Sequence, residues 1–466
     1  MKSKLTLLIL FVLGIFTSTK ASHLMGGQIT ASRIDTFKYA IDLTLYRDTD
    51  GIPMATIDVI NYAEDSMGTW IYDTVHNVYA TTGLYFINGT EVYHFYDTIT
   101  FNHYGKFMIT WQNCCRNYEI INMSAPGNEN LFLTTVVNVD SLSPNSTPVF
   151  LNPPVTLAQK NVYWNYNPLP YDADGDSIAW QLVTPLSYGP QFPVAGYTIP
   201  RSNPLQAFTL DTITGQISWM PDTIGHFVAS FLVSEFRNGV KIGEIRRDMQ
   251  IIVIEDSTNF DRFKFATSTW SQNAQGYFEI PVLVNFQNTL SVVGTDNDND
   301  FCNLSGAGET FMLTPNPSTL SVTPGNGIVN ATFSWMPNMS NLRSRNYLTV
   351  FRGDELHGTY HYLTDVTVGF KVVAELNGTN ELNQSIINIY PNPATDKLIV
   401  QYSQQYPTKG QLQVLNSLGQ VMVQTDLVNS VGMHNTMIQT SAWPQGVYFV
   451  QVQQGGQTKT QRFVKQ

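Results

Sequence analysis

The chain has 466 residues, enough for about three domains with buried cores of their own. Charged residues make up 13% of the chain and aromatic residues 12%. This composition is too aromatic and too weakly charged for a disordered protein. The net charge of −11 and the lack of a long basic block argue against a nucleic-acid partner, and three cysteines exclude a disulfide-built miniprotein.

Residues 1–21 have the three parts of a secretory signal peptide. Two lysines precede an apolar run over residues 5–16, which is shorter than a membrane-spanning helix requires. Thr19 and Ala21 place small residues at the expected positions of a cut before Ser22. The sequence therefore predicts export and no transmembrane segment after the signal is removed; the alternative is an N-terminal anchor that stays attached.

Strand patterns dominate the rest of the chain. Apolar and polar residues alternate over 37–45, and a similar texture recurs over 227–233 and 447–452. Turn signals punctuate these runs, among them the Asn-Gly pair at 238–239. No stretch sustains a helical apolar period over three turns, so the sequence predicts an all-β fold.

An internal repeat divides the middle of the chain. The tetrapeptide Ser-Trp-Met-Pro occurs at 218–221 and again at 334–337, each time after a strand-like segment. Two units of about 100 residues with short strands fit antiparallel sandwiches, in which Trp219 and Trp335 would be structural. The predicted organisation is a signal peptide (1–21), an N-terminal β-domain (22–151), two Ig-like or cadherin-like sandwiches (152–256 and 257–375), a polar linker (376–385) and a C-terminal module (386–466).

An acidic loop precedes a predicted strand in each sandwich. In the sandwich predicted over 152–256, Asp172, Asp174 and Asp176 stand on alternate residues, a spacing that lets a tight turn direct several oxygens at one Ca²⁺ ion. The loop is not an EF-hand, because Val183 stands where a bidentate Glu would be needed. A solvated turn without an ion is the alternative. The sandwich predicted over 257–375 leaves the same two alternatives open at residues 296, 298 and 300, which are all aspartates.

Linear catalytic motifs are missing. The chain has no nucleophile elbow, zinc-protease motif, phosphate-binding loop or dinucleotide fingerprint. His357 and His361 are four residues apart but lie in a strand pattern, which favours surface or hairpin positions over metal ligation. The sequence therefore predicts a protein that is not an enzyme, although paired carboxylates of a glycoside hydrolase have no linear signature.

Three N-terminal segments carry a family resemblance. Residues 22–30 (SHLMGGQIT), 45–48 (LYRD) and 114–117 (CCRN) resemble the N-terminal β-domain of gliding-motility-associated, adhesin-like surface proteins of Bacteroidota. That family often has a cysteine after Tyr-Arg-Asp, where this chain has Thr49. Cys114 and Cys115 can bond each other through a strained ring, or remain reduced or pair differently.

The C-terminal module resembles a second family. The segments YPNPATD (390–396), LNSLGQ (415–420), PQGVYFV (444–450) and KTQRFVK (459–465) resemble the type A C-terminal sorting domain of the type IX secretion system of Bacteroidota. The resemblance implies a small β-sandwich that the outer-membrane translocon recognises and that is usually cut off. The residues that carry the sorting motif are Pro391, Asn392, Pro393, Gly419, Gly446, Tyr448 and Lys465.

Together these features predict an exported, cell-surface or secreted, non-catalytic protein. Its expected role is adhesion or the binding of glycan or matrix, with an extracellular ligand that the sequence does not identify. Ca²⁺ is the one cofactor that the residues suggest. The alternative is a secreted hydrolase or the accessory binding module of one.

Overall fold

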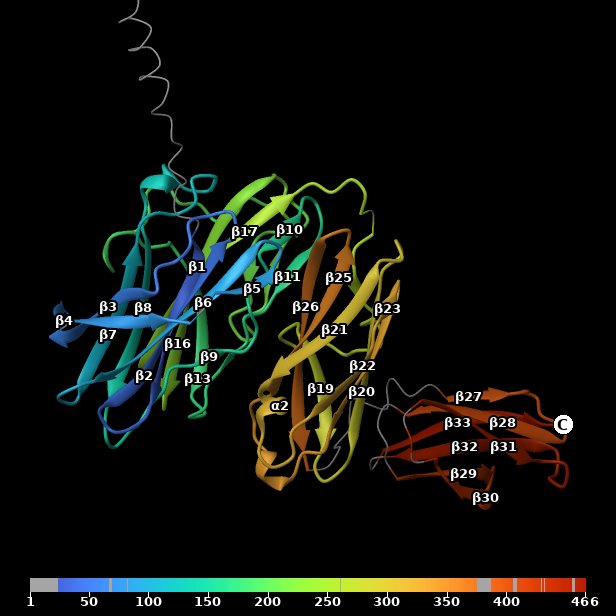
Figure 1. Cartoon of the computed structure of the whole chain (residues 1–466). Helices are drawn as coiled ribbons and strands as arrows, with labels where there is room; N and C mark the ends of the chain where they lie inside the picture. The colour runs from blue at the N-terminus through green and yellow to red at the C-terminus, as the bar shows by residue number, and fades with distance from the viewer. Residues whose placement is uncertain are drawn as a thin grey trace, which may run out of the picture. The chain divides into compact units, whose positions relative to one another are not determined.

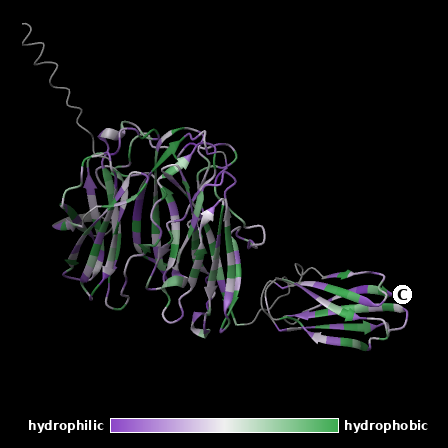
Figure 2. Cartoon of the chain, turned by 45° about the vertical axis from the view of Figure 1, so that its right-hand side comes forward, coloured by the Kyte–Doolittle hydropathy of each residue, from purple (hydrophilic) through white to green (hydrophobic). Residues whose placement is uncertain are grey.

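The computed structural model describes residues 24–66, 69–81, 83–259, 261–374, 387–404, 409–428, 430, 432–454 and 457–466. The predicted signal peptide (1–21) and linker (376–385) lie outside these residues. Almost every element is a strand, and hydrophobic and hydrophilic residues alternate along many of them (Figures 1 and 2). The prediction of an all-β fold with tandem antiparallel sandwiches is confirmed.

Two compact units are distinguished. One contains the residues up to 280 together with 289–334 and 346–370, and the other contains 281–288, 335–345 and the residues from 371 onward. The helical segments within the described residues are short, namely η1 (Pro126–Asn128), α2 (Glu309–Met312) and η2 (Met339–Asn341).

The first part of the chain forms one long antiparallel sheet. Its core is a cluster of fully buried aliphatic and aromatic side chains that includes Ile29, Phe95 and Trp111. The strands follow the order β1 (Leu24–Arg33), β2 (Lys38–Asp48), β6 (Thr90–Thr100), β4 (Thr69–Ala80), β3 (Ile57–Ser66), β7 (Gly105–Asn113) and β8 (Leu131–Val139), and β5 (Leu84–Ile87) pairs with β6.

This sheet continues into the next module through β17 (Val240–Ile254). One edge of β17 pairs with β16 (Gly225–Arg237), and the other edge pairs in turn with β8, β1 and β10 (Leu157–Gln159). Strands from both sides of the predicted boundary at 151 therefore share one hydrogen-bonded sheet. Gly26 allows the approach of β1, because a Cβ there would lie 2.2 Å from the carbonyl oxygen of Asp248.

The Cys-Cys-Arg-Asn segment lies against the same strand. The structure joins Cys114 and Cys115 in a disulfide, while Cys302 is a buried free thiol. The guanidinium of Arg116 donates to both carboxylate oxygens of Asp248 on β17, at 2.8 and 2.9 Å, and both side chains are buried. Arg116 thus ties the first module to the second through a buried ion pair.

The second module, within residues 149–254, forms a sandwich that we call the second sandwich, and smaller sheets complete it. Trp164, Trp219 and Phe227 meet edge to face in its core. Beside β16 lies β13 (Ser177–Val183), and the opposite sheet consists of β11 (Trp164–Tyr166), β15 (Ile217–Trp219) and β14 (Thr209–Leu210); β9 (Val149–Phe150) and β12 (Pro170–Tyr171) form a further pair.

The third sandwich follows the same plan. Phe333 contacts both Phe351 and Phe370 across the two sheets. One sheet contains β18 (Lys264–Phe265), β20 (Asn288–Thr295), β24 (Ile328–Trp335) and β22 (Thr319–Thr323), and the other contains β19 (Phe278–Leu283), β26 (Tyr360–Val373), β25 (Tyr347–His357), β21 (Phe301–Gly308) and β23 (Gly325–Asn326). The repeated tryptophans are both buried, and each ends its strand, β15 or β24.

The C-terminal module is a small sandwich with its own core. Its buried side chains include Leu398, Val414, Val450 and Phe463. One sheet contains β27 (Ile387–Tyr390), β28 (Lys397–Gln404) and β31 (Gly432–Gln439), and the other contains β30 (Val421–Asp426), β29 (Gly410–Asn416), β32 (Gly446–Gln454) and β33 (Gln457–Lys465).

Candidate functional site

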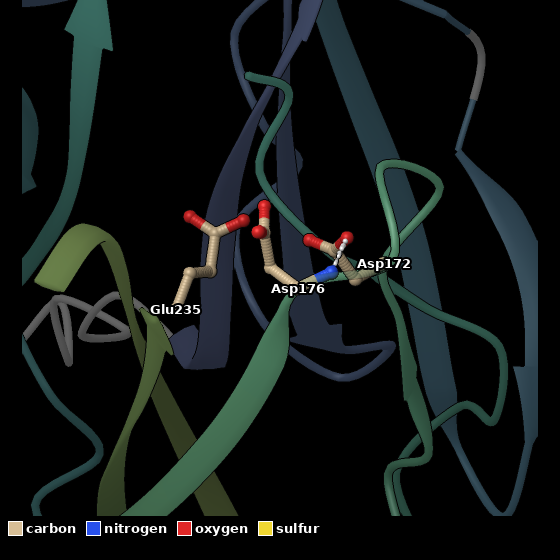
Figure 3. A group of neighbouring side chains, drawn as sticks. All are labelled: Asp172, Asp176 and Glu235. Atoms are coloured by element: carbon tan, nitrogen blue, oxygen red, sulfur yellow. Dashed lines mark hydrogen bonds between the residues drawn. The ribbon is translucent and has the colours of Figure 1, made fainter. Parts of the chain in front are cut away.

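Three buried carboxylates meet where the acidic loop before β13 passes the end of β16. The pairing of Ser177 with Phe236 brings Asp176 beside the end of β16. One oxygen from each of Asp172, Asp176 and Glu235 lies within 4.8 Å of the others, and the three residues are 6%, 4% and 0% exposed. Figure 3 shows their carboxyl groups gathered on one side of the loop. We call these three residues the first carboxylate cluster.

The cluster differs from the predicted ligand set. Asp174 is exposed and its Oδ2 accepts a hydrogen bond from the backbone N–H of Ser146 at 2.7 Å, so it holds the loop in place rather than joining the cluster. Glu235 takes part instead, and sequence reasoning missed it because it lies about 60 residues downstream on another strand. Its position three residues before the Asn-Gly turn signal at 238–239 is a local signal that places it near the end of a strand.

The first carboxylate cluster contains oxygens that no donor satisfies. Arg237 donates to both oxygens of Asp176, at 2.7 and 2.6 Å, and the N–H of Asp176 donates to Asp172 Oδ1 at 2.9 Å. Among the described residues, Asp172 Oδ2 and Glu235 Oε1 are buried without a hydrogen-bond partner. Two buried carboxylates so close together must share either a proton or a cation. Leaving both of them charged, without a counter-ion or a hydrogen-bond donor, costs several kcal/mol.

The raised pKa of Glu235 indicates how strongly the first carboxylate cluster favours a bound proton or cation. Burial, with the neighbouring Asp172 as the next cause, raises the pKa of Glu235 from 4.5 to about 10. A carboxyl group with such a pKa keeps its proton at neutral pH unless a cation replaces that proton.

This pKa predicts how the cation-free chain responds to pH. The folded chain holds a proton on Glu235 that the unfolded chain releases above pH 4.5, so the free energy of unfolding should fall as the pH rises from 4.5 toward about 10. Urea unfolding in EDTA across this window measures the slope. Glu235→Gln, which cannot ionise, should make the slope shallower, and equal slopes in the two chains would contradict the assignment.

The third sandwich carries a second carboxylate cluster in the same register. Asp296, Asp300 and Glu355 bring one oxygen each within 4.8 Å of the others. The pairing of Phe301 with Leu356 matches that of Ser177 with Phe236 in position. Asp298, like Asp174, is exposed and accepts a backbone N–H through Oδ2, here from Asp261 at 2.7 Å.

The second cluster supplies more positive charge of its own. Arg262 donates to Glu355 Oε1 at 2.9 Å, and the N–H of Phe263 donates to Glu355 Oε2 at 2.6 Å. His357 lies 2.7 Å from Asp300, and this hydrogen bond raises the pKa of the imidazole. Asp296 Oδ2 is buried without a partner among the described residues. The second cluster thus contacts both a guanidinium and an imidazole, whereas the first contacts the guanidinium of Arg237.

The two histidines singled out in the sequence do not converge. His357 ends β25, whereas His361 lies on β26 and its Nδ1 pairs with Asp354 at 2.9 Å. Each imidazole thus contacts a different carboxylate, that of Asp300 in the acidic loop for His357 and that of Asp354 across the β25–β26 hairpin for His361.

The sorting motif occupies loops and strand ends of the C-terminal module. Pro391, Asn392 and Pro393 form an exposed loop, and Asn392 Oδ1 accepts a hydrogen bond from the N–H of Val464 at 3.0 Å. Gly419 has a φ of 80° in the turn between β29 and β30, a conformation that favours glycine. The loop at 391–393 is thereby attached to the last strand of the chain.

The remaining motif residues frame the last hairpin. Gly446 begins β32 and pairs with Lys465 near the end of β33. Tyr448 is buried, its ring packs on Phe463 at 5.5 Å, and its hydroxyl donates to Pro444 O at 2.8 Å. The predicted motif segments therefore belong to one structural unit.

Comparison with known proteins identifies this module. Residues 388–466 match the family described as the secretion system C-terminal sorting domain. No curated protein sequence matches significantly. Within the described residues, no helix is long and apolar enough to cross a membrane.

Solved structures give only remote similarities. A Drosophila N-cadherin EC1-4 fragment has a TM-score of 0.19 and 13% identity, and the alignment covers 89% of this chain and 92% of that one. The four N-terminal Ig domains of Dscam1 isoform 9.44 give 0.18 and 11%, covering 95% and 94%. The CupB2 chaperone of Pseudomonas aeruginosa gives 0.17 and 11%, covering 40% and 96%.

Proposed function

The C-terminal module is a type IX secretion sorting domain, so the chain is exported across the outer membrane to the cell surface or the extracellular space. We propose that this exported chain is a non-catalytic adhesion protein whose first carboxylate cluster binds Ca²⁺. The tandem sandwiches would present binding surfaces outside the cell. The ion would hold the acidic loop against β16 and stiffen the second sandwich.

The observation that carries the Ca²⁺ assignment is the pair of buried, unsatisfied oxygens on Asp172 and Glu235. Calcium is bound by several carboxylate and carbonyl oxygens in flexible geometry, and the cluster offers oxygen atoms only. Asp172, Asp176 and Glu235 carry three negative charges when ionised, against one positive charge on Arg237. A divalent cation would offset this excess of two negative charges.

The same geometry argues against the alternative of a hydrolase at this place. Many glycosidases use two neighbouring carboxyl groups as their catalytic pair, one of them with a strongly raised pKa. A catalytic group must touch its substrate, however, and Glu235 is 0% exposed. Zymography of the exported chain on polysaccharide and protein substrates tests this proposal, and we expect no cleared zone. Hydrolysis abolished by one Asp or Glu substitution would overturn it.

Calcium binding predicts a shift in thermal stability. The melting temperature of the second sandwich in the full-length chain should rise by several degrees when EDTA is replaced by excess CaCl₂, because an ion that binds only the folded state stabilises it by mass action. Differential scanning calorimetry measures the rise. Asp172→Asn should abolish it.

Glu255→Gln is the matched control, since the Glu255 side chain is 61% exposed and pairs with Lys160 at the surface. This variant should keep the full response to calcium. If calcium leaves the wild-type melting temperature unchanged, Asp172 and Glu235 share a proton instead and the Ca²⁺ proposal fails.

A further inference from the structure

A pocket of about 510 Å³ lies beside the small sheet β11–β15–β14. Its volume falls within the range of about 300–1,000 Å³ that is typical of small-molecule sites. One wall is the outer face of this sheet, where Asn165, Ser218 and Thr209 stand side by side in register. The other walls come from the segment 272–278 and from residues 365–367 of β26.

The sheet separates an aromatic face from a polar face. Trp164, Tyr166 and Trp219 point into the core of the second sandwich, and the residues between them point to the pocket, as the alternation of a strand requires. The hydroxyl of Ser218 donates to Asn165 Oδ1 at 2.8 Å. This bond fixes the orientation of the Asn165 amide and leaves its N–H groups as donors. The exposed Thr209 adds a second hydroxyl at the rim of the pocket.

The pocket contains no positive charge for an anionic ligand. Among the described residues that line it, none is Lys, Arg or His. Each of its two carboxylates has donors of its own: Asp211 accepts the N–H groups of Ile213 and Thr214 through Oδ1, at 2.9 and 2.7 Å. Asp365 is held by Arg352 through two bonds of 2.8 and 2.9 Å. These charges and bonds favour a neutral ligand.

Two aromatic side chains line the opposite side. The Tyr277 hydroxyl accepts a hydrogen bond from Asn346 Nδ2 at 2.9 Å, and the Phe278 ring packs edge to face against Trp270 at 5.4 Å. Both residues remain partly exposed. Aromatic rings that such contacts hold in place offer apolar surface to a ligand at a low cost in conformational entropy.

We infer that this pocket binds a neutral saccharide, the class of ligand that combines many hydroxyl groups with apolar C–H faces. Amide and hydroxyl groups on one wall would hydrogen-bond the sugar hydroxyls, and Tyr277 or Phe278 would pack against a ring face. The inference rests on the proposed adhesion function and names its ligand class. Acidic sugars and sulfated glycans are disfavoured because the pocket carries carboxylates and no cation.

The test uses the exported chain and a panel of labelled oligosaccharides that end in mannose, galactose, glucose or N-acetylglucosamine, with sialylated and sulfated members included. We expect binding of a neutral member. Thr209→Trp, which places an indole at the rim of the pocket, should weaken that binding by about tenfold or more. Thr323→Trp is the matched control, because Thr323 is an equally exposed strand threonine outside the pocket, and it should leave binding unchanged.

Three results would overturn the inference: no neutral member bound at millimolar concentration, undiminished binding by Thr209→Trp, or a preference for the sialylated or sulfated members. Calorimetry must show that both variants melt like the wild type, and Asn165→Ala provides a second variant if Thr209→Trp does not. Attachment of cells that display each chain to matrix-coated surfaces is measured in parallel. Attachment that survives the loss of saccharide binding would leave the adhesion proposal standing, whereas no attachment by the wild type would contradict that proposal itself.

Discussion

Arg116→Ala is expected to destabilise the exported chain by about 3–5 kcal/mol, since it leaves Asp248 as a buried charge without its partner. The two side chains are 2% and 1% exposed, and Arg116 also donates to the carbonyl oxygens of Asn130 and Leu186. Removal of the guanidinium therefore leaves several buried acceptors unsatisfied at the join between the first and second modules. Urea unfolding followed by tryptophan fluorescence measures the loss.

Arg201→Ala is the matched control. Arg201 also pairs with an aspartate, Asp222, at 3.0 Å, but its side chain is 75% exposed. An exposed pair of this kind contributes about 0–1 kcal/mol, so the control should unfold almost as the wild type does. Equal losses in the two variants would show that burial does not set the strength of the Arg116–Asp248 pair.

Deletion of residues 386–466 is expected to abolish delivery to the cell surface, because this segment contains the sorting domain matched at 388–466. The truncated chain should accumulate in the periplasm, provided that its signal peptide acts as predicted. Immunoblots of periplasmic, surface and medium fractions measure the change.

The control transfers the same segment to another protein. A periplasmic reporter that ends in residues 386–466 should reach the surface or the medium. A truncated chain found at the surface in normal amounts would contradict the assignment of export to this module, and so would a reporter that stays in the periplasm while the full-length chain is exported.

The sequence predicted features that depend on neighbouring residues. Alternation along the chain predicted the strands, and the repeated Ser-Trp-Met-Pro segment marked two strands that end on a buried tryptophan. The acidic loop was also visible, because Asp172 and Asp176 are four residues apart. The sorting domain could be predicted because its motifs lie in one short segment in a fixed order.

Features that depend on distant pairing could not be predicted in this way. Glu235 joins Asp172 only through the register of β13 on β16, and no local pattern encodes that register. The same holds for Arg116, whose partner Asp248 lies 132 residues away. The polar pocket likewise depends on the pairing of short strands that brings Asn165 beside Ser218, 53 residues along the chain.

The shared edge of β17 determines which parts of the chain can be separated by proteolysis. A cut near residue 151 would leave β1 and β8 without the segments of β17 that they pair with, at Met249 and Glu244, and would expose unpaired backbone groups. Exposed strand edges are templates for aggregation. A soluble fragment released outside the cell is therefore expected to retain the chain from β1 to at least the end of β17, so shedding should proceed by cleavage after residue 254 rather than by loss of the N-terminal module.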